Sequence, residues 1–253
     1  MSSVQEKKDI HLVYKNLGET PLNSIQRFKK DNPVYEGLPI TYAGRLDPMA
    51  EGLLILLAGD SVNNKDKYLD LPKIYVVEML WGFETDTLDL LGLATLKKEF
   101  SVPKEEVRKY LEKSTGKFEQ KYPAYSSKPV QGKPMFQWAR EGRIGEIDIP
   151  EHEVSLFETK YLSRRTLLGK DLLTEIYTKV GLVSGDFRQK EILEKWKEVL
   201  IEGGGRDFVV DKFELRVSSG FYVRQFVKDF AETFGGVATT FHIQRTQIGD
   251  YKI

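Results

Sequence analysis

The chain has 253 residues, and its 38 basic and 38 acidic side chains give a formal net charge of zero. This length is enough for one large domain or two small ones with a sizeable core. The absence of cysteine excludes disulfides, thiolate metal sites and a cysteine nucleophile. The neutral balance argues against a strongly basic nucleic-acid binder but allows a local basic face.

The histidines and the apolar runs further narrow the class of protein. Only His11, His152 and His242 occur, and no two have the spacing of metal ligands, so no metal is expected. No apolar run reaches the length of a membrane span, and the start of the chain lacks the apolar region of a signal peptide. We therefore expect a cytoplasmic protein without a membrane partner.

The first elements in chain order are a strand, a capped helix and a second strand. Residues 11–15 predict the first strand. Thr20 is placed to cap a helix that has Pro21 at its first position and ends at residues 31–33. The apolar run 53–57 predicts a buried strand. The stripe expected to face inward from the helix consists of Leu22, Ile25 and Phe28.

The middle of the chain predicts one strand and two helices. Residues 74–81 have the composition of a strand. Residues 102–114 predict a helix capped by Ser101 and ended by Gly116. A shorter helix is expected over 135–141, closed by Gly142. The side chains expected to face inward from the longer helix are Val107, Tyr110 and Leu111.

The last third mixes both periodicities. Residues 172–180 alternate and predict a strand, and residues 212–217 predict another. Between them, 187–201 predict a charged helix, followed by a flexible glycine-rich join at 203–205. A final helix is expected to start near Phe221 and end at 235–236. Its apolar stripe consists of Val223, Phe226, Val227, Phe230 and Phe234.

These elements predict an α+β fold with a mixed, mostly antiparallel central sheet flanked by helices. The strands come in hairpin-like pairs, which differ from the regular strand–helix–strand units of a parallel sheet. No repeat or low-complexity linker divides the chain. The simplest division is one catalytic domain over 1–253, with a helical insertion at about 185–205.

One loop aspartate and one helical arginine are candidates for chemistry. Asp47 lies in a loop bent by Gly44 and Pro48, directly before the buried strand. Arg224 lies in the first turn of the last helix, where free N–H groups create positive potential. An arginine there can hold a carboxylate ionised, as a nucleophile requires. Loop aspartates and solvated arginines are nonetheless common, and the sequence does not establish that these two side chains meet.

Three further features each leave two interpretations open. Residues 85–89 form an acidic cluster whose simpler interpretation is a hydrogen-bonded turn. Residues 121–128 mix aromatic and basic side chains, which suits either a surface loop or a groove that stacks RNA bases. Tyr75 lies on a strand, where a tyrosine usually belongs to the core. No Walker loop, nucleophile elbow or dinucleotide fingerprint is present.

Taken together, five blocks in order resemble the TruB-type pseudouridine synthases, which isomerise uridine in the T-loop of tRNA. The blocks span nearly the whole chain, so their order is far more specific than any one of them. They are 15–21, similar to K-P-x-G-x-T-S; 44–52, similar to G-T-L-D-P-x-A-x-G; 75–92, similar to Y…G-x-x-T-D-T-x-D-x-x-G; 122–140, similar to P-P-x-Y-S-A-x-K…A-R; and 219–246, similar to S-K-G-T-Y-I-R…D…R-R-T.

The resemblance implies a catalytic centre and a pseudouridine synthase fold with a central catalytic cleft. Asp47 would be the aspartate that attacks while the glycosidic bond breaks and re-forms. Tyr75 would stack on the extruded uracil and assist proton removal from C5, and Arg224 would pair with Asp47. No metal or organic cofactor is implied, because the reaction needs neither redox chemistry nor external energy.

The resemblance also implies residues that bind substrate or RNA. Tyr222 and Ile243 would line the base pocket, and Lys15 would support the catalytic loop. Tyr42 stands where the family usually has a histidine, and it could still stack on the substrate. With Arg45, residues 44–47 resemble the G-R-L-D motif of the related RluA-type and RsuA-type pseudouridine synthases. A phosphate-binding face could come from Arg27, Lys29, Lys30, Arg140, Arg143, Arg164 and Arg165.

The expected protein is a pseudouridine synthase without the C-terminal PUA domain of many bacterial members, acting as a monomer on the tRNA T-arm or another structured RNA. Three alternatives remain. The same chemistry could act on ribosomal RNA or another tRNA position, which Tyr42 and Arg45 motivate. The chain could be a non-catalytic RNA-binding or tRNA-folding protein. A glycoside hydrolase would need a second carboxylate, such as Asp86 or Asp89.

Overall fold

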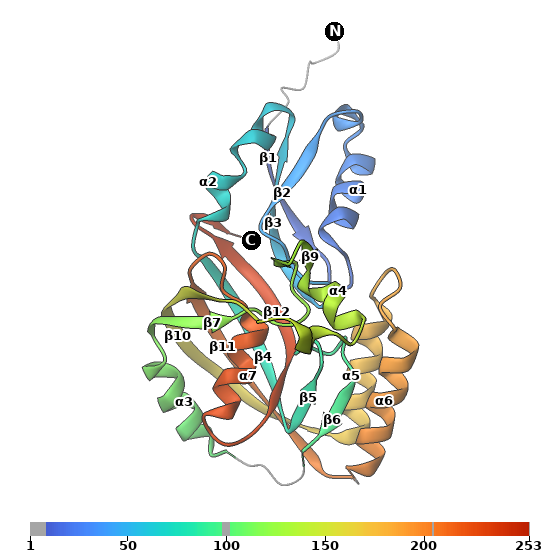
Figure 1. The fold of residues 1–253 in the computed structure, drawn as a ribbon, viewed down its shortest axis with the longest axis vertical. Coiled ribbons are helices and arrows are strands. Elements are labelled where there is room, and N and C mark those ends of the chain that lie inside the picture. Colours follow the sequence, from blue (N-terminus) through green and yellow to red (C-terminus); the bar gives the residue numbers. More distant parts are fainter. Residues whose placement is uncertain (1–8, 98–101, 204, 253) are drawn as a thin grey trace.

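The structure is a computed structural model that describes residues 9–97, 102–203 and 205–252. A long twisted sheet runs through this part of the chain, with helices packed against both of its faces (Figure 1). The sheet is mixed, because β3 and β12 pair in parallel and its other neighbouring strands pair antiparallel. This arrangement confirms the predicted α+β class with a mostly antiparallel central sheet.

The strand order explains how distant segments meet. The main path runs through β1 (Ile10–Lys15), β3 (Ala50–Ala58), β12 (Ala238–Ile248), β4 (Lys73–Trp81), β11 (Asp207–Val217), β10 (Glu151–Leu168) and β7 (Gly116–Lys121); β2 (Ile40–Ala43) adds to β3, and β13 (Tyr251–Lys252) adds to β12. The strand β12, from near the end of the chain, therefore lies between β3, which follows the Asp47 loop, and β4, which carries Tyr75.

The helices and minor strands complete the described fold. The helices are α1 (Pro21–Asp31), α2 (Asp66–Leu69), α3 (Lys104–Lys113), α4 (Met135–Arg140), α5 (Gly169–Gly181), α6 (Gln189–Glu202) and α7 (Val223–Glu232). Two small hairpins pair β5 (Phe83–Thr85) with β6 (Ala94–Leu96) and β8 (Pro129–Val130) with β9 (Lys133–Pro134). Short 3-10 turns occupy Pro33–Tyr35, Gly59–Asn64 and Ile144–Glu146.

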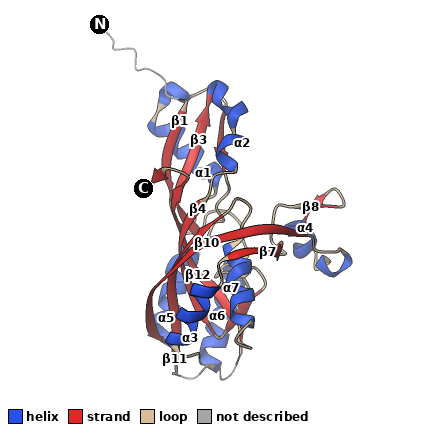
Figure 2. Cartoon of the chain, turned by 90° about the vertical axis from the view of Figure 1, so that its left-hand side faces the viewer, coloured by secondary structure: helices blue, strands red, loops and turns tan. Residues whose placement is uncertain are grey.

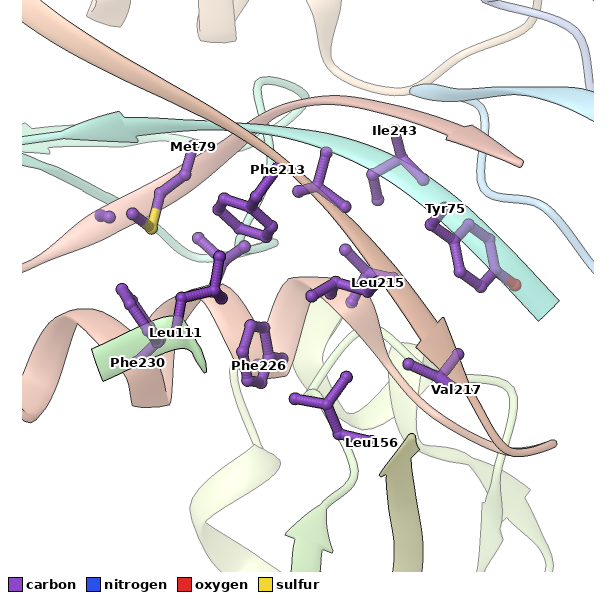
Figure 3. Close-up of a cluster of buried hydrophobic side chains, with 14 of the residues drawn as sticks. Tyr75, Met79, Leu111, Leu156, Phe213, Leu215, Val217, Phe226, Phe230 and Ile243 are labelled. Atoms are coloured by element: carbon purple, nitrogen blue, oxygen red, sulfur yellow. The ribbon is translucent and has the colours of Figure 1, made fainter. Parts of the chain in front are cut away.

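Two hydrophobic clusters lie on opposite faces of the sheet. On one face, Phe226 and Phe230 of α7 pack on Phe213 of β11, and Tyr75 and Ile243 lie at one end of this cluster (Figure 3). On the other face, α5 and α6 bury Trp196 against neighbouring strands. Each fully buried large apolar side chain contributes about 1.5–3 kcal/mol. The position of α7, and thus of Arg224 at its start, is fixed by this packing.

One predicted strand is wrong. Residues 172–180 belong to the helix α5, and the buried members of the segment are Leu172, Ile176 and Val180. A spacing of four residues satisfies both the strand period of two and the helix period of 3.6. The intervening threonines, Thr174 and Thr178, donate hydrogen bonds to carbonyls four residues earlier, as helical threonines do.

Several helix details also differ from expectation. Leu22 is 59% exposed and Tyr110 is 41% exposed, so neither belongs to the buried stripe of its helix. Helix α3 begins after Pro103, and the expected cap, Ser101, lies outside the described residues, as does part of the join at 203–205. Gly116 opens β7, since the helix has already ended at Lys113. The other predicted helices and strands are confirmed within a few residues.

The parallel contact between β3 and β12 requires a glycine at position 52. Gly52 has φ +111°, and a Cβ there would lie 2.3 Å from the carbonyl oxygen of Arg245. Gly52→Ala is therefore expected to lower the free energy of unfolding by about 3 kcal/mol or more, measured by urea denaturation. Gly37→Ala is the matched control, because Gly37 has φ +79° and open space around it. It should cost only about 1 kcal/mol, and equal losses in the two variants would contradict the close approach.

Candidate active site

A cleft of about 760 Å³ opens beside the Asp47 loop. Its walls come from segments far apart in the sequence, including the Asp47 loop, β4, the start of α7, and α4. The segment that carries β8 and α4 projects from the sheet, as Figure 2 shows. The cleft has both apolar and charged walls, as expected of a site that binds and transforms a ligand.

Asp47 and Arg224 meet in this cleft. The Nε of Arg224 donates to Oδ2 of Asp47 at 2.8 Å. The remaining nitrogens of Arg224 donate to the carbonyl oxygens of Thr87 and, at 3.2 Å, Tyr125. The arginine side chain is 4% exposed, whereas that of Asp47 is 42% exposed. The carboxylate of Asp47 is thus held in one orientation at the cleft by a buried guanidinium whose nitrogens all have acceptors.

Asp89 is a second carboxylate behind the pair. Its Oδ2 lies 3.8 Å from the Nε of Arg224, and its Oδ1 accepts from the Thr87 hydroxyl and the Leu91 amide. Burial raises the pKa of Asp89 to about 6, with the charge of Asp47 adding to the shift and Arg224 opposing it. Residues 85–89 thus form the hydrogen-bonded turn favoured by the sequence. They also supply Asp89 as a counter-ion to Arg224, which the turn interpretation did not identify.

The raised pKa of Asp89 predicts a pH dependence of stability. Below its unfolded value of 3.8 both states are protonated, and above about 6 both are ionised. Between these limits the folded state binds the proton more tightly, so the free energy of unfolding should fall as pH rises, by about 3 kcal/mol in all. Urea denaturation at a series of pH values should show this fall in the parent protein relative to Asp89→Asn. A difference between the two that stays flat or rises across this window would contradict the assignment.

Two buried cations hold the backbone of the Asp47 loop. Lys15 donates to the carbonyls of Asn16 and, at 2.5 Å, Ala50. Arg245 donates to the carbonyls of Gly44, Arg45 and Leu53 at 2.8 to 3.3 Å. Lys15 is fully buried, and burial lowers its pKa to about 8. These contacts agree with the expected role of Lys15 in supporting the catalytic loop, and its burial leaves it no exposed surface for RNA.

Three of the expected residues contribute to the apolar lining of the cleft. Tyr75, Tyr222 and Ile243 all line it. Burial, with the nearby charge of Asp47, raises the pKa of Tyr222 to about 12, so its hydroxyl stays protonated. The side chain of Gln120 on β7 accepts from the amide of Tyr222 and donates to its carbonyl. Sequence reasoning missed this clamp, because a lone glutamine carries no signal for it.

Arg45 and Tyr42 occupy different environments although they are close in sequence. Arg45 is exposed at the cleft and donates to the hydroxyl of Ser127 at 2.5 Å. Tyr42 is not among the residues lining the cleft, because β2 turns its ring toward the cluster that contains Leu54 and Leu56. The structure therefore does not bring Tyr42 to the catalytic residues. Tyr125 and Ser126 join Ser127 in lining the cleft, as the groove interpretation of 121–128 expects.

The seven basic residues expected to form a phosphate-binding face differ in their partners. Arg164 donates to the buried Asp211, and Arg27, Arg143 and Arg165 are paired with glutamates. Lys29 donates to the carbonyl of Leu38. Arg140, on α4, lines the cleft. Lys30 is exposed. Four of the seven are thus paired with carboxylates of the same chain, and of the seven only Arg140 lines the cleft.

The described residues also bear on metals and membranes. Across 9–97, 102–203 and 205–252, no three His, Cys, Asp or Glu side chains gather as a metal site would require. In the same part of the chain, no helix combines the length and apolar character needed to span a membrane.

Comparisons with known proteins agree with the geometry. A tRNA pseudouridine synthase B of Thermotoga maritima is 28% identical over 247 residues, which cover 98% of this chain and 65% of that protein. A protein of the same name from Bordetella avium is 25% identical over 245 residues, covering 96% of this chain and 81% of that one. The chain thus spans less than two thirds of the Thermotoga relative.

Solved structures share the fold at low identity. A Cbf5–Nop10–Gar1 complex matches with a TM-score of 0.58 and 15% identity, covering 96% of this chain and 49% of the matched chain. An H/ACA ribonucleoprotein bound to a substrate RNA containing 2'-deoxyuridine matches with a TM-score of 0.55, also at 15% identity, covering 96% and 48%.

A match to a protein-family model shows the family to which this chain belongs. The model for the N-terminal domain of TruB family pseudouridylate synthases matches residues 35–181, a range that includes Asp47, Tyr75 and Asp89. It covers more than half of the chain, and the protein therefore belongs to the TruB family of pseudouridylate synthases.

Proposed function

We propose that this protein isomerises uridine to pseudouridine in RNA, with the T-loop of tRNA as its preferred substrate. The single observation that carries the proposal is the Asp47 carboxylate, oriented by Arg224 at the wall of an open cleft. The relatives named tRNA pseudouridine synthase B favour tRNA as the substrate class. Such an enzyme must accept an extruded nucleotide, and a cleft of about 760 Å³ has room for one.

The chemistry assigned to Asp47 is nucleophilic. Its carboxylate acts at C1′ of the ribose as the bond from C1′ to N1 breaks and the electron pair leaves with the uracil. The detached base rotates, the bond from C1′ to C5 forms as the bond from C1′ to the Asp47 carboxylate breaks, C5 loses its proton and N1 gains one. Atoms and electrons balance without an oxidant or a second substrate. In this proposal Arg224 keeps Asp47 ionised and aimed at the sugar.

The cleft walls have proposed roles in holding the base. Tyr75 stacks on the uracil and assists removal of the C5 proton, while Tyr222 and Ile243 keep water from the reacting atoms. Arg45 contacts the RNA at the exposed edge of the cleft. Tyr42, half-buried beside Leu54 and Leu56, remains a proposed RNA contact away from the reacting base. We further propose that residues 1–253 act as one catalytic domain, as a monomer and without a cofactor, with a helical insertion at about 185–205 that contains α6.

Release of tritium from uridine C5 tests the reaction and the substrate together. Purified protein is incubated with a tRNA transcript labelled at uridine C5, an isolated T-arm hairpin, an anticodon-arm hairpin and a ribosomal RNA fragment. Release from the tRNA and the T-arm hairpin alone is the expected result. Release only from ribosomal RNA or the anticodon arm would move the substrate, as Arg45 suggests. Binding of RNA without release from any of them would support the non-catalytic alternative.

A further inference from the structure

The turn between α5 and α6, residues 182–188, touches both sides of the catalytic cleft. The two helices lie side by side on one face of the sheet, and α7, which carries Arg224, lies on the other face (Figure 1). Their connecting turn nevertheless reaches the cleft, where Phe187 and Arg188 line the wall. This turn therefore connects the helical insertion to the reacting centre.

On the Arg224 side, Arg188 binds two loops at once. Its terminal nitrogen donates to Oδ2 of Asp86 at 2.9 Å, and its guanidinium lies 5.6 Å from the ring centre of Tyr125. The Tyr125 hydroxyl donates to the same Asp86 oxygen at 3.0 Å. The other oxygen, Oδ1, accepts from the Leu93 amide. Asp86 is thus the point at which Arg188, the 85–89 turn and the 122–127 segment are joined.

These same two loops supply the acceptors of Arg224. The carbonyl of Thr87 follows Asp86 directly, and the carbonyl of Tyr125 belongs to the residue that Arg188 covers. Both accept from the terminal nitrogens of Arg224, while its Nε binds Asp47. A displacement of either carbonyl would change the direction of the guanidinium. Arg188 is therefore linked to the Asp47–Arg224 pair through the two segments that carry the Thr87 and Tyr125 carbonyls.

On the Asp47 side, the turn packs against Gly18. The amide of Ser184 donates to the Gly18 carbonyl at 3.2 Å, and the Gly18 amide donates to the carbonyl of Pro48, next to Asp47. A Cβ on Gly18 would lie 2.1 Å from the carbonyl oxygen of Leu182, so the two backbones are in close contact. The turn thus braces the loops on both sides of the ion pair.

The backbone of Arg188 adds a reason to regard the contact as specific. Arg188 has φ +63° and ψ +25°, a left-handed conformation that is unfavourable for a residue with a side chain. In this conformation its side chain reaches Asp86. An exposed ion pair of this type contributes little to stability by itself.

We propose that Arg188 is a positioning residue for the reaction, which holds Arg224 against Asp47 by fixing Asp86 and Tyr125. The inference rests on the proposed function and extends it to the helical insertion. Arg188 does not touch the reacting atoms. Its effect should appear in the rate of the chemical step and much less in RNA affinity.

The activity test compares Arg188→Gln with Asp86→Asn, the double variant, and Arg188→Lys. The rate of single-turnover tritium release should fall about 10-fold in Arg188→Gln and about 10-fold in Asp86→Asn. The RNA dissociation constant should change less than about twofold in each. The double variant should be no slower than the slower single variant, because both remove the same contact. Arg188→Lys should recover part of the rate. The matched control is Arg216→Gln, because Arg216 also binds a carboxylate, Glu158, and lies over an aromatic ring, Phe157, away from the cleft.

A second measurement does not depend on activity. In the ¹⁵N-labelled protein the Nε–H signal of Arg224, identified by its loss in Arg224→Lys, should exchange slowly with water. It should exchange faster in Arg188→Gln and remain unchanged in Arg216→Gln. An unchanged signal, a loss of RNA affinity without a loss of rate, or additive losses in the double variant would overturn the proposal. A parent protein without tritium release would instead contradict the proposed function, and the exchange measurement would still decide the role of Arg188.

Discussion

Replacing Asp47 with asparagine is expected to lower the single-turnover rate of isomerisation by about 1,000-fold or more. The amide is neutral and a poor nucleophile, so it cannot replace the carboxylate at C1′. Its oxygen can still accept from the Nε of Arg224, which donates to Asp47 at 2.8 Å in the parent protein. The substitution thus removes the reacting group while keeping the local hydrogen bond. Tritium release from the T-arm hairpin measures the effect.

The control for this experiment separates chemistry from folding. Asp47 is 42% exposed, so Asp47→Asn should change the free energy of unfolding by no more than about 1 kcal/mol. Asp60→Asn makes the same chemical change in an exposed turn outside the cleft and should keep full activity. An Asp47→Asn protein that is folded and as fast as the parent would contradict the nucleophilic role.

Arg224→Gln is expected to lower the rate by about 100-fold or more and also to destabilise the protein. The guanidinium uses its nitrogens on Asp47 and on the carbonyls of Thr87 and Tyr125, and glutamine cannot reach all three. Buried Asp89 would also lose the cation that favours its ionised form. The loss of stability should be about 3 kcal/mol, since it leaves buried groups without partners. Tritium release and urea denaturation measure the two effects.

Two variants make the interpretation of Arg224 specific. Arg224→Lys keeps the positive charge but not the planar fork, so it should recover stability more than rate. Arg108→Gln removes an arginine that is exposed on α3 and paired with Glu105 and Glu112, and it should change neither quantity appreciably. Full activity in Arg224→Gln would show that Asp47 does not need this partner.

The sequence predicted the elements whose periodicity was unambiguous. The run 53–57 lies inside β3, and Phe226 and Phe230 of α7 are buried as expected, because spacings of three and four residues occur together there. Phe234, also expected in this stripe, lies beyond the end of α7 and is half-buried. The segment 172–180 had buried residues only at intervals of four, which both periods share, so β-branched side chains favoured the wrong choice. The long strand β10 was missed because few of its side chains are buried.

The site was predictable only in part, for a related reason. The motifs identified Asp47, Tyr75 and Arg224 separately, but their meeting depends on the placement of β12 between β3 and β4, which has no local signal. The sequence also could not show that Tyr42 turns toward the core or that Lys15 is fully buried. Asp89 and Arg188 act through contacts of long sequence separation, which only the folded chain reveals.

The nucleosides produced from RNA give the most direct test of the proposed reaction. Purified protein is incubated with an unmodified T-arm hairpin, the RNA is digested to nucleosides, and these are separated by chromatography and analysed by mass spectrometry. Pseudouridine of unchanged mass should appear with the parent protein and be absent with Asp47→Asn. Free uracil with an abasic site would instead indicate hydrolysis, and pseudouridine formed equally by Asp47→Asn would contradict the role assigned to this carboxylate.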